Sequence, residues 1–234
     1  MFVPLHDDNY LRSIKLQYVT IGLITVNVLV FLLNLSGLPE SVIASFAIVP
    51  NELVTTARIF YPGESVPQTI AVPERLTLLS YMFFHGDIIH LAGNMLFLWV
   101  FGDNVEDAMG HARFLIFYLA CGVFAGLTHV YMMPDSGSPL IGASGAVAGV
   151  IAAYLMLHPR VRVWVLAFQF LPLRLSAATV LGVWIALQFI MLLLPDIGPI
   201  AWWAHIGGLI AGAVLILFMR RRGVPLFDSN LRST

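Results

Sequence analysis

Long apolar segments with almost no charge dominate this sequence. Six of them follow one another, at residues 19–35, 88–102, 114–132, 141–157, 176–194 and 200–219. A helix needs about 20 mostly apolar residues to cross the hydrocarbon of a bilayer, and a shorter helix is tolerated where neighbouring helices shield it. The pattern therefore predicts an all-α, polytopic membrane protein with a bundle of six transmembrane helices.

The composition supports a membrane protein and excludes other classes. Hydrophobic residues make up 59% of the chain, charged residues 11%, and the mean hydropathy is +0.88, far from the balance of soluble domains. A net charge of -1 argues against nucleic acid as a partner, because a phosphate-binding groove needs an excess of Lys and Arg. The single cysteine, Cys121, excludes a disulfide within the chain.

The distribution of basic residues predicts the orientation, because Lys and Arg accumulate on the cytoplasmic side of a membrane protein. If the N-terminus is inside, only Arg58 and Arg75 fall outside. The other ten of the 12 basic residues fall inside: Arg12, Lys15, Arg113, Arg160, Arg162, Arg174, Arg220, Arg221, Arg222 and Arg232. We therefore expect both termini to be cytoplasmic.

The segments between the spans complete the predicted organisation. Residues 1–18 form a short cytoplasmic segment, residues 19–219 the membrane domain, and residues 220–234 a short cytoplasmic tail. Residues 36–84 mix prolines with apolar stretches, which predicts a folded outer loop lying in the membrane interface. Residues 161–173 carry three aromatic residues between arginines: Trp164, Phe168 and Phe170. This stretch is expected to be irregular and to rest at the inner interface.

Four polar side chains within the apolar segments stand out: His90, Asn94, Ser144 and His205. Polar groups are costly in a bilayer, so they indicate functional sites. With a rise of about 1.5 Å per residue, the predicted topology places His90, Ser144 and His205 near the outer ends of three helices. His90 and Asn94 are four residues apart and share a helix face. We therefore expect the four side chains to meet in the outer leaflet.

Small residues accompany the serine and the histidine. The expected helix-packing glycines are Gly142, Gly145 and Gly149 near Ser144, and Gly208 and Gly212 after His205. Glycines at this spacing allow two helix backbones to approach closely. A short serine side chain needs such an approach to reach an imidazole on another helix.

Nucleophilic catalysis is the chemistry that these groups allow. A serine hydroxyl is a weak nucleophile until a base accepts its proton, and imidazole suits that role near neutral pH. The last three predicted spans contain no Asp or Glu, so Ser144 and His205 are expected to form a dyad. Ser144 also opens a helix, where backbone N–H groups favour an oxyanion. Its N–H, the Asn94 amide and the His90 ring are the expected oxyanion donors.

The polar positions lie within three short motifs. These are His90-xxx-Asn94, Gly142-Ala143-Ser144-Gly145 and Ala204-His205-Ile206-Gly207-Gly208-xxx-Gly212. In content and order the motifs resemble the signatures of the rhomboid proteases, over residues 19–219. The resemblance implies a six-span core of the bacterial type, a Ser144–His205 catalytic dyad, and oxyanion stabilisation by His90 and Asn94. Gly102 and Glu106 resemble the turn that follows the second span in that family.

The resemblance implies a function and a location. The chain is expected to be an intramembrane serine endopeptidase that cuts single-span membrane proteins near the outer leaflet, at small residues in helices that unwind easily. Its partners are those substrates and the lipid bilayer, with no nucleic acid, metal or cofactor. The expected location is the bacterial inner membrane, as a multi-pass protein.

Other functions remain to be weighed against proteolysis. Rhomboid-like scaffolds have lost the serine or the histidine, whereas this chain keeps Ser144 and His205. A transporter would place its polar groups near the bilayer midplane at broken helices. A metal site built on His85, His90, His129 and His205 would lack both an H-E-x-x-H pair and a nearby carboxylate ligand.

Overall fold

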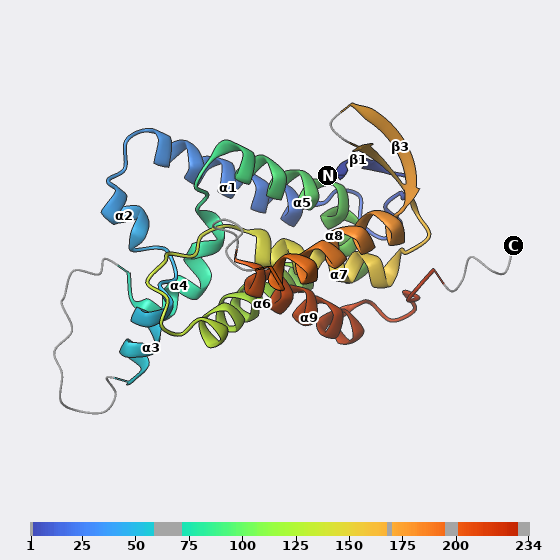
Figure 1. The fold of residues 1–234 in the computed structure, drawn as a ribbon. Helices are drawn as coiled ribbons and strands as arrows, with labels where there is room; N and C mark the ends of the chain where they lie inside the picture. The colour runs from blue at the N-terminus through green and yellow to red at the C-terminus, as the bar shows by residue number, and fades with distance from the viewer. Residues whose placement is uncertain (1, 59–71, 168–169, 195–200, 229–234) are drawn as a thin grey trace, which may run out of the picture.

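The computed structural model describes residues 2–58, 72–167, 170–194 and 201–228. It is mostly helical, which confirms a polytopic helical membrane protein (Figure 1). Within the described residues, four helices are long and apolar enough to cross a membrane: α1 (Tyr18–Leu35), α5 (Ile88–Met109), α6 (His111–Met132) and α9 (Trp202–Met219). Two apolar helices are shorter: α7 (Ser144–Leu157) and α8 (Ala177–Leu192). The count of six spans therefore stays a prediction.

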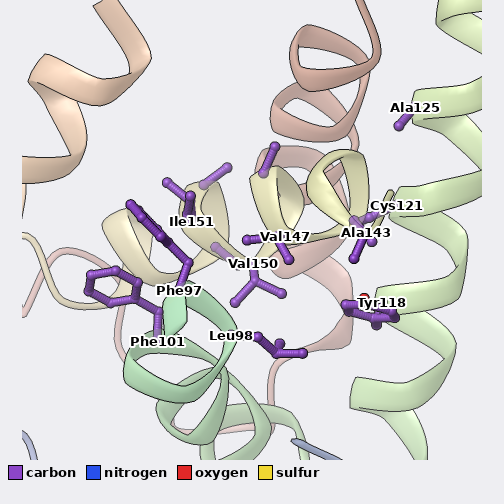
Figure 2. Close-up of a cluster of buried hydrophobic side chains, with 14 of the residues drawn as sticks. Phe97, Leu98, Phe101, Tyr118, Cys121, Ala125, Ala143, Val147, Val150 and Ile151 are labelled. Atoms are coloured by element: carbon purple, nitrogen blue, oxygen red, sulfur yellow. The ribbon is translucent and has the colours of Figure 1, made fainter. Parts of the chain in front are cut away.

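Helix α7 lies at the centre of the bundle and packs against α5, α6 and α9. All of its residues are buried except Ser144, Leu155 and Met156. Figure 2 shows α7 side chains surrounded by side chains of its neighbours: Phe97, Leu98 and Phe101 from α5, and Tyr118, Cys121 and Ala125 from α6. Because protein surrounds α7 on these sides, a short helix can lie in the bundle without exposing its backbone to lipid.

The junction between α5 and α6 differs from its prediction. The turn expected at Gly102 and Glu106 is wrong, because both residues lie inside α5, which continues to Met109. The break falls at Gly110, whose φ of 86° lies in the left-handed region that favours glycine. Gly102 instead lies where α1 approaches α5, since a Cβ there would come within 3.3 Å of the Thr20 side chain.

The outer connection, residues 36–84, contains regular structure in its described parts. It forms α2 (Glu40–Ala44), α3 (Pro50–Arg58), α4 (Glu74–Ser80) and the 3₁₀ turn η1 (Tyr81–Phe83), while residues 59–71 lie outside the described residues. Backbone hydrogen bonds between Ile48 and Leu140 tie this connection to the segment before α7. The Ser80 hydroxyl also donates to the Phe46 carbonyl oxygen at 2.8 Å. The connection is therefore a folded unit, and its place in the membrane interface stays a prediction.

A three-stranded antiparallel sheet was not predicted from the sequence. It consists of β1 (Phe2–Asp7), β2 (Arg162–Ala167) and β3 (Leu171–Ser176), with β2 in the middle. The stretch at residues 161–173 is thus largely a β-hairpin, not irregular, and Phe168 lies outside the described residues. Buried and exposed residues alternate along β2, as expected for a half-buried strand. Figure 1 places the sheet at the end of the bundle opposite to α2 and α3.

Glu106 anchors the start of α1. Its carboxylate accepts hydrogen bonds from the Val19 and Thr20 N–H groups at 3.0 and 2.8 Å, and from the Thr20 hydroxyl at 2.7 Å. The His111 ring contacts the same carboxylate at 2.5 Å. A carboxylate is favourable here because the free N–H groups and the positive dipole end of α1 face it. The neighbouring Asp107 accepts three backbone N–H groups of residues 12–14, so two adjacent acids hold the N-terminal segment on α5.

Replacing Glu106 tests this anchor. The Glu106→Gln variant keeps one acceptor oxygen but turns an NH₂ group towards backbone donors. We expect it to unfold more easily in detergent, by about 1–3 kcal/mol. The matched control is Glu52→Gln, at an exposed position in the first turn of α3, which should change stability by less than about 0.5 kcal/mol. Equal melting temperatures for the two variants would contradict the anchoring role.

Candidate functional site

Ser144 is the first residue of α7 and is half-buried. The backbone before it is held by the segment that precedes α5. The Gly142 N–H donates to the Tyr81 carbonyl oxygen at 2.9 Å, and the Ala143 N–H donates to His85 Nε2 at 3.4 Å. Gly142 has a φ of 121°, in the left-handed region that favours glycine. These contacts fix the direction in which α7 begins and hence the position of Ser144.

His85 supports this turn as a neutral ring. It is buried, and burial together with the adjacent His90 ring lowers its pKa to about 4. A neutral imidazole has one nitrogen free to accept, which agrees with Nε2 accepting the Ala143 N–H. His85 and His90 pack edge to face with ring centroids 5.0 Å apart.

His90 lies against the backbone that leads to Ser144. A Cβ at Gly142 would come within 2.6 Å of His90 Cε1 and 2.8 Å of Nε2, so only a glycine leaves room for the ring. The start of α5 is fixed by Asp87, whose side chain accepts the Ile89 and His90 N–H groups at 2.8 Å. The structure therefore brings His90 next to the start of α7.

Asn94 lies one turn further along α5 and is buried. Its Nδ2 has no hydrogen-bond partner among the residues that the structure describes. Buried polar atoms are rarely left unpaired in folded proteins, because an unmet donor costs about 1–3 kcal/mol. An amide donor kept free in this way is available to an oxygen atom of a bound substrate.

The backbones of α7 and α9 touch at two pairs of glycines. A Cβ at Gly208 would lie 1.9 Å from the Gly145 carbonyl oxygen. A Cβ at Gly212 would lie 2.2 Å from the Gly149 carbonyl oxygen. Real Cβ atoms do not approach an oxygen so closely, so this crossing requires glycine at both positions of α9.

The same contact between α7 and α9 also involves the sequence neighbours of Ser144 and His205. A Cβ at Gly145 would lie 3.5 Å from the Ala204 carbonyl oxygen, so these two backbones face each other. Ser144 immediately precedes Gly145, and His205 immediately follows Ala204. No hydrogen bond joins the Ser144 hydroxyl to His205 in the described part of the chain, so the dyad stays a prediction.

His205 is buried within an aromatic and amide environment. Its ring lies 5.9 Å from the Trp202 ring and 6.0 Å from the Trp184 ring, measured between centroids. Its Nδ1 forms a hydrogen bond of 2.7 Å with Gln188 Oε1. These contacts restrict rotation of the ring and leave Nε2 as the nitrogen without a hydrogen bond to the described residues.

Three residues at this site were not predicted: Tyr81, His85 and Gln188. Gln188 left a signal in the sequence, because it is the only strongly polar residue in the apolar run at residues 180–194. His85 is a histidine just before a span but carries no motif of its own. Tyr81 acts through its backbone carbonyl towards Gly142 and through its hydroxyl, which donates to the Gly122 carbonyl oxygen at 2.7 Å. Every residue type has a backbone carbonyl, so a contact of this kind cannot be predicted from the residue types.

Comparison with known proteins identifies the family. Residues 73–222 match the Rhomboid domain, which is more than half of the chain. The chain belongs to the rhomboid family. Membership of this family supports an intramembrane-protease type of function. The apolar helices support an integral membrane protein.

Several relatives of this rhomboid are themselves described as rhomboid proteins. The human presenilin-associated rhomboid-like protein, mitochondrial, is 29% identical over 206 residues, which are 84% of this chain and 47% of that protein. Rhomboid protease GluP of Bacillus subtilis is 39% identical over 93 residues, 40% of this chain and 18% of GluP. RHOMBOID-like protein 6, mitochondrial, of Arabidopsis thaliana is 32% identical over 152 residues, which are 63% of this chain and 45% of that protein. The chain thus spans about half the length of the human relative.

The glycine crossing generates a prediction about stability. Gly208→Ala would drive a methyl group into the Gly145 carbonyl oxygen and force α7 and α9 apart, so we expect a destabilisation of about 1–3 kcal/mol. Gly182→Ala is the control, because a Cβ at that position on α8 has no atom within 4 Å. That change should be neutral or stabilising by up to about 1 kcal/mol. Thermal unfolding in detergent compares the two, and an unchanged Gly208→Ala protein would contradict the close crossing.

Proposed function

We propose that this chain is an intramembrane serine endopeptidase in which Ser144 is the nucleophile and His205 the general base. The observation that carries the proposal is the close contact between α7 and α9 at Gly145 and Ala204, which are the sequence neighbours of Ser144 and His205. A nucleophile and its base must lie within hydrogen-bond reach, at least once a substrate is bound. Close contact between the two backbones supports such proximity for a side chain as short as serine.

The proposed reaction proceeds through an acyl-enzyme. The Ser144 oxygen attacks the substrate carbonyl carbon while its proton passes to His205 Nε2. The oxyanion that forms accepts hydrogen bonds from the Ser144 N–H at the start of α7, from Asn94 Nδ2, which has no partner among the described residues, and from the His90 ring. When the C–N bond breaks, His205 returns the proton to the leaving amine. Water then hydrolyses the ester, with His205 again accepting a proton.

The proposed substrates are single-span membrane proteins whose helices unwind easily. The predicted topology puts Ser144 in the outer leaflet, so the cut falls within or just outside the outer half of the substrate's span. The orientation with both termini in the cytoplasm rests on the asymmetry of Lys and Arg. We assign the protein to a bacterial inner membrane on its resemblance to bacterial rhomboids; some relatives are mitochondrial, and cell fractionation tests the assignment.

Removal of either member of the dyad tests the proposal. Ser144→Ala and His205→Ala should each lower cleavage of a model single-span substrate by at least about 10³-fold, because nucleophile and base act as a unit. His205→Ala should also stop Ser144 from reacting with a serine-directed covalent inhibitor. Normal labelling of the His205→Ala variant would overturn the mechanism. A cut mapped by mass spectrometry to the cytoplasmic half of the substrate's span would overturn the predicted topology.

The oxyanion role of Asn94 predicts a graded loss. Asn94→Ala should lower kcat by about 10²–10³-fold while leaving activity above that of Ser144→Ala, because the backbone N–H and His90 remain. Its melting temperature should fall by only a few degrees, since the Nδ2 donor that it loses has no partner among the described residues. Asn34→Ala, in the last turn of α1, is the matched control and should keep full turnover. Wild-type kcat in a folded Asn94→Ala protein would leave Asn94 a packing role only.

A further inference from the structure

Gln188 is a buried amide in an otherwise apolar helix. It is 5% exposed and lies in α8, which packs against α9. Strongly polar side chains inside an apolar membrane helix are costly and are retained where they have a partner. Its partner is His205, whose Nδ1 lies 2.7 Å from Gln188 Oε1. The proposed base is thus in direct contact with an amide from a third helix.

The orientation of this amide is fixed by its second contact. Gln188 Nε2 donates to the Trp184 carbonyl oxygen at 3.1 Å, one helical turn earlier. A carbonyl oxygen can only accept, so the NH₂ group must face Trp184 and Oε1 must face His205. An amide oxygen can also only accept, so His205 Nδ1 must carry the hydrogen of that bond.

We propose that Gln188 is a positioning residue that holds His205 in the Nδ1–H tautomer. A neutral imidazole carries one hydrogen, so a protonated Nδ1 leaves the lone pair on Nε2. Nε2 is then the nitrogen that accepts the Ser144 proton. This inference rests on the proposed function, because it assigns Gln188 a task within the same reaction.

The role matches that of the carboxylate in a serine protease triad, which orients the histidine and selects its tautomer. A carboxylate would have to be buried here beside two tryptophan rings, where an isolated charge is costly. An amide gives the same orientation without a charge. The Nδ1–H also stays bonded to Gln188 when Nε2 is protonated, so the contact persists throughout the reaction.

A purely structural role for Gln188 is the competing explanation. A hydrogen bond between α8 and α9 would stabilise the bundle whichever ring nitrogen carried the hydrogen, because polar side chains commonly link membrane helices. Such a role predicts a lower melting temperature but an unchanged turnover per folded molecule. The tautomer of His205 and the separation of kcat from KM distinguish the two explanations.

The experiment compares Gln188→Met with the wild type in detergent. Methionine keeps the length and apolar stem of the side chain but removes the acceptor. The matched control is Leu187→Met, the preceding and exposed residue of α8, which should keep wild-type turnover. For Gln188→Met we expect kcat per folded molecule to fall about tenfold, as for loss of one hydrogen bond to the base, with KM unchanged.

The tautomer is read separately by ¹⁵N NMR on protein labelled at histidine, near pH 8. The His205 signals are those missing from the His205→Ala variant. We expect Nδ1 to be protonated in the wild type and this preference to be lost in Gln188→Met. A wild-type His205 protonated on Nε2, an unchanged tautomer in Gln188→Met, or wild-type kcat in that variant would each overturn the proposal. If the tautomer changes as expected but the wild type cleaves no membrane substrate, the tautomer assignment stands and the proposed protease function fails.

Discussion

The contact between the backbones of α7 and α9 is the constraint on which the site depends. Lipid tails are as apolar as leucine, so membrane helices associate through close packing and hydrogen bonds rather than through the hydrophobic effect. The pairing of Gly145 with Gly208 and of Gly149 with Gly212 provides that packing. Helix α6 closes in on the same region, since a Cβ at Gly149 would lie 2.5 Å from the sulfur of Cys121. The α9 backbone and the Cys121 side chain of α6 therefore both lie close against α7, where a larger side chain at these glycines would not fit.

Helix α7 is also held at both of its ends. At its start, the Gly142 N–H donates to the Tyr81 carbonyl oxygen of the outer connection, and the Ala143 N–H donates to His85, which follows that connection. Near its other end, the Tyr154 hydroxyl donates to Asp7 of β1, and burial raises the pKa of that carboxyl to about 6. Asp7 in turn accepts the Asn104 amide of α5 at 3.2 Å. A helix fixed at both ends and along its length gives Ser144 a defined position.

Local patterns predicted the helices and the candidate residues, whereas long-range pairing was not predictable. The length of the apolar runs and the spacing of the glycines are properties of neighbouring residues, so they could be read directly. The sheet joins β1 to β2 across most of the chain, with Phe2 opposite Ala167, and no local period predicts such a partner. The end of α5 was misplaced because Gly102 looked like a turn, although it serves a helix contact with Thr20. Gln188 was visible as a polar residue, but its partner depends on how α8 packs on α9.

The end of the bundle that carries the sheet and the candidate site differ in the polar groups that they bury. At the end that carries the sheet, the carboxylates of Glu106 and Asp107 accept hydrogen bonds from backbone N–H groups that would otherwise need water as a partner. The candidate site uses neutral groups instead: Asn94, Gln188 and histidine rings. A permanent charge at that depth would have to be desolvated in the resting protein, whereas neutral donors and acceptors carry no such cost. Charge would then arise only during the proposed reaction, as an oxyanion and an imidazolium that form together and neutralise each other.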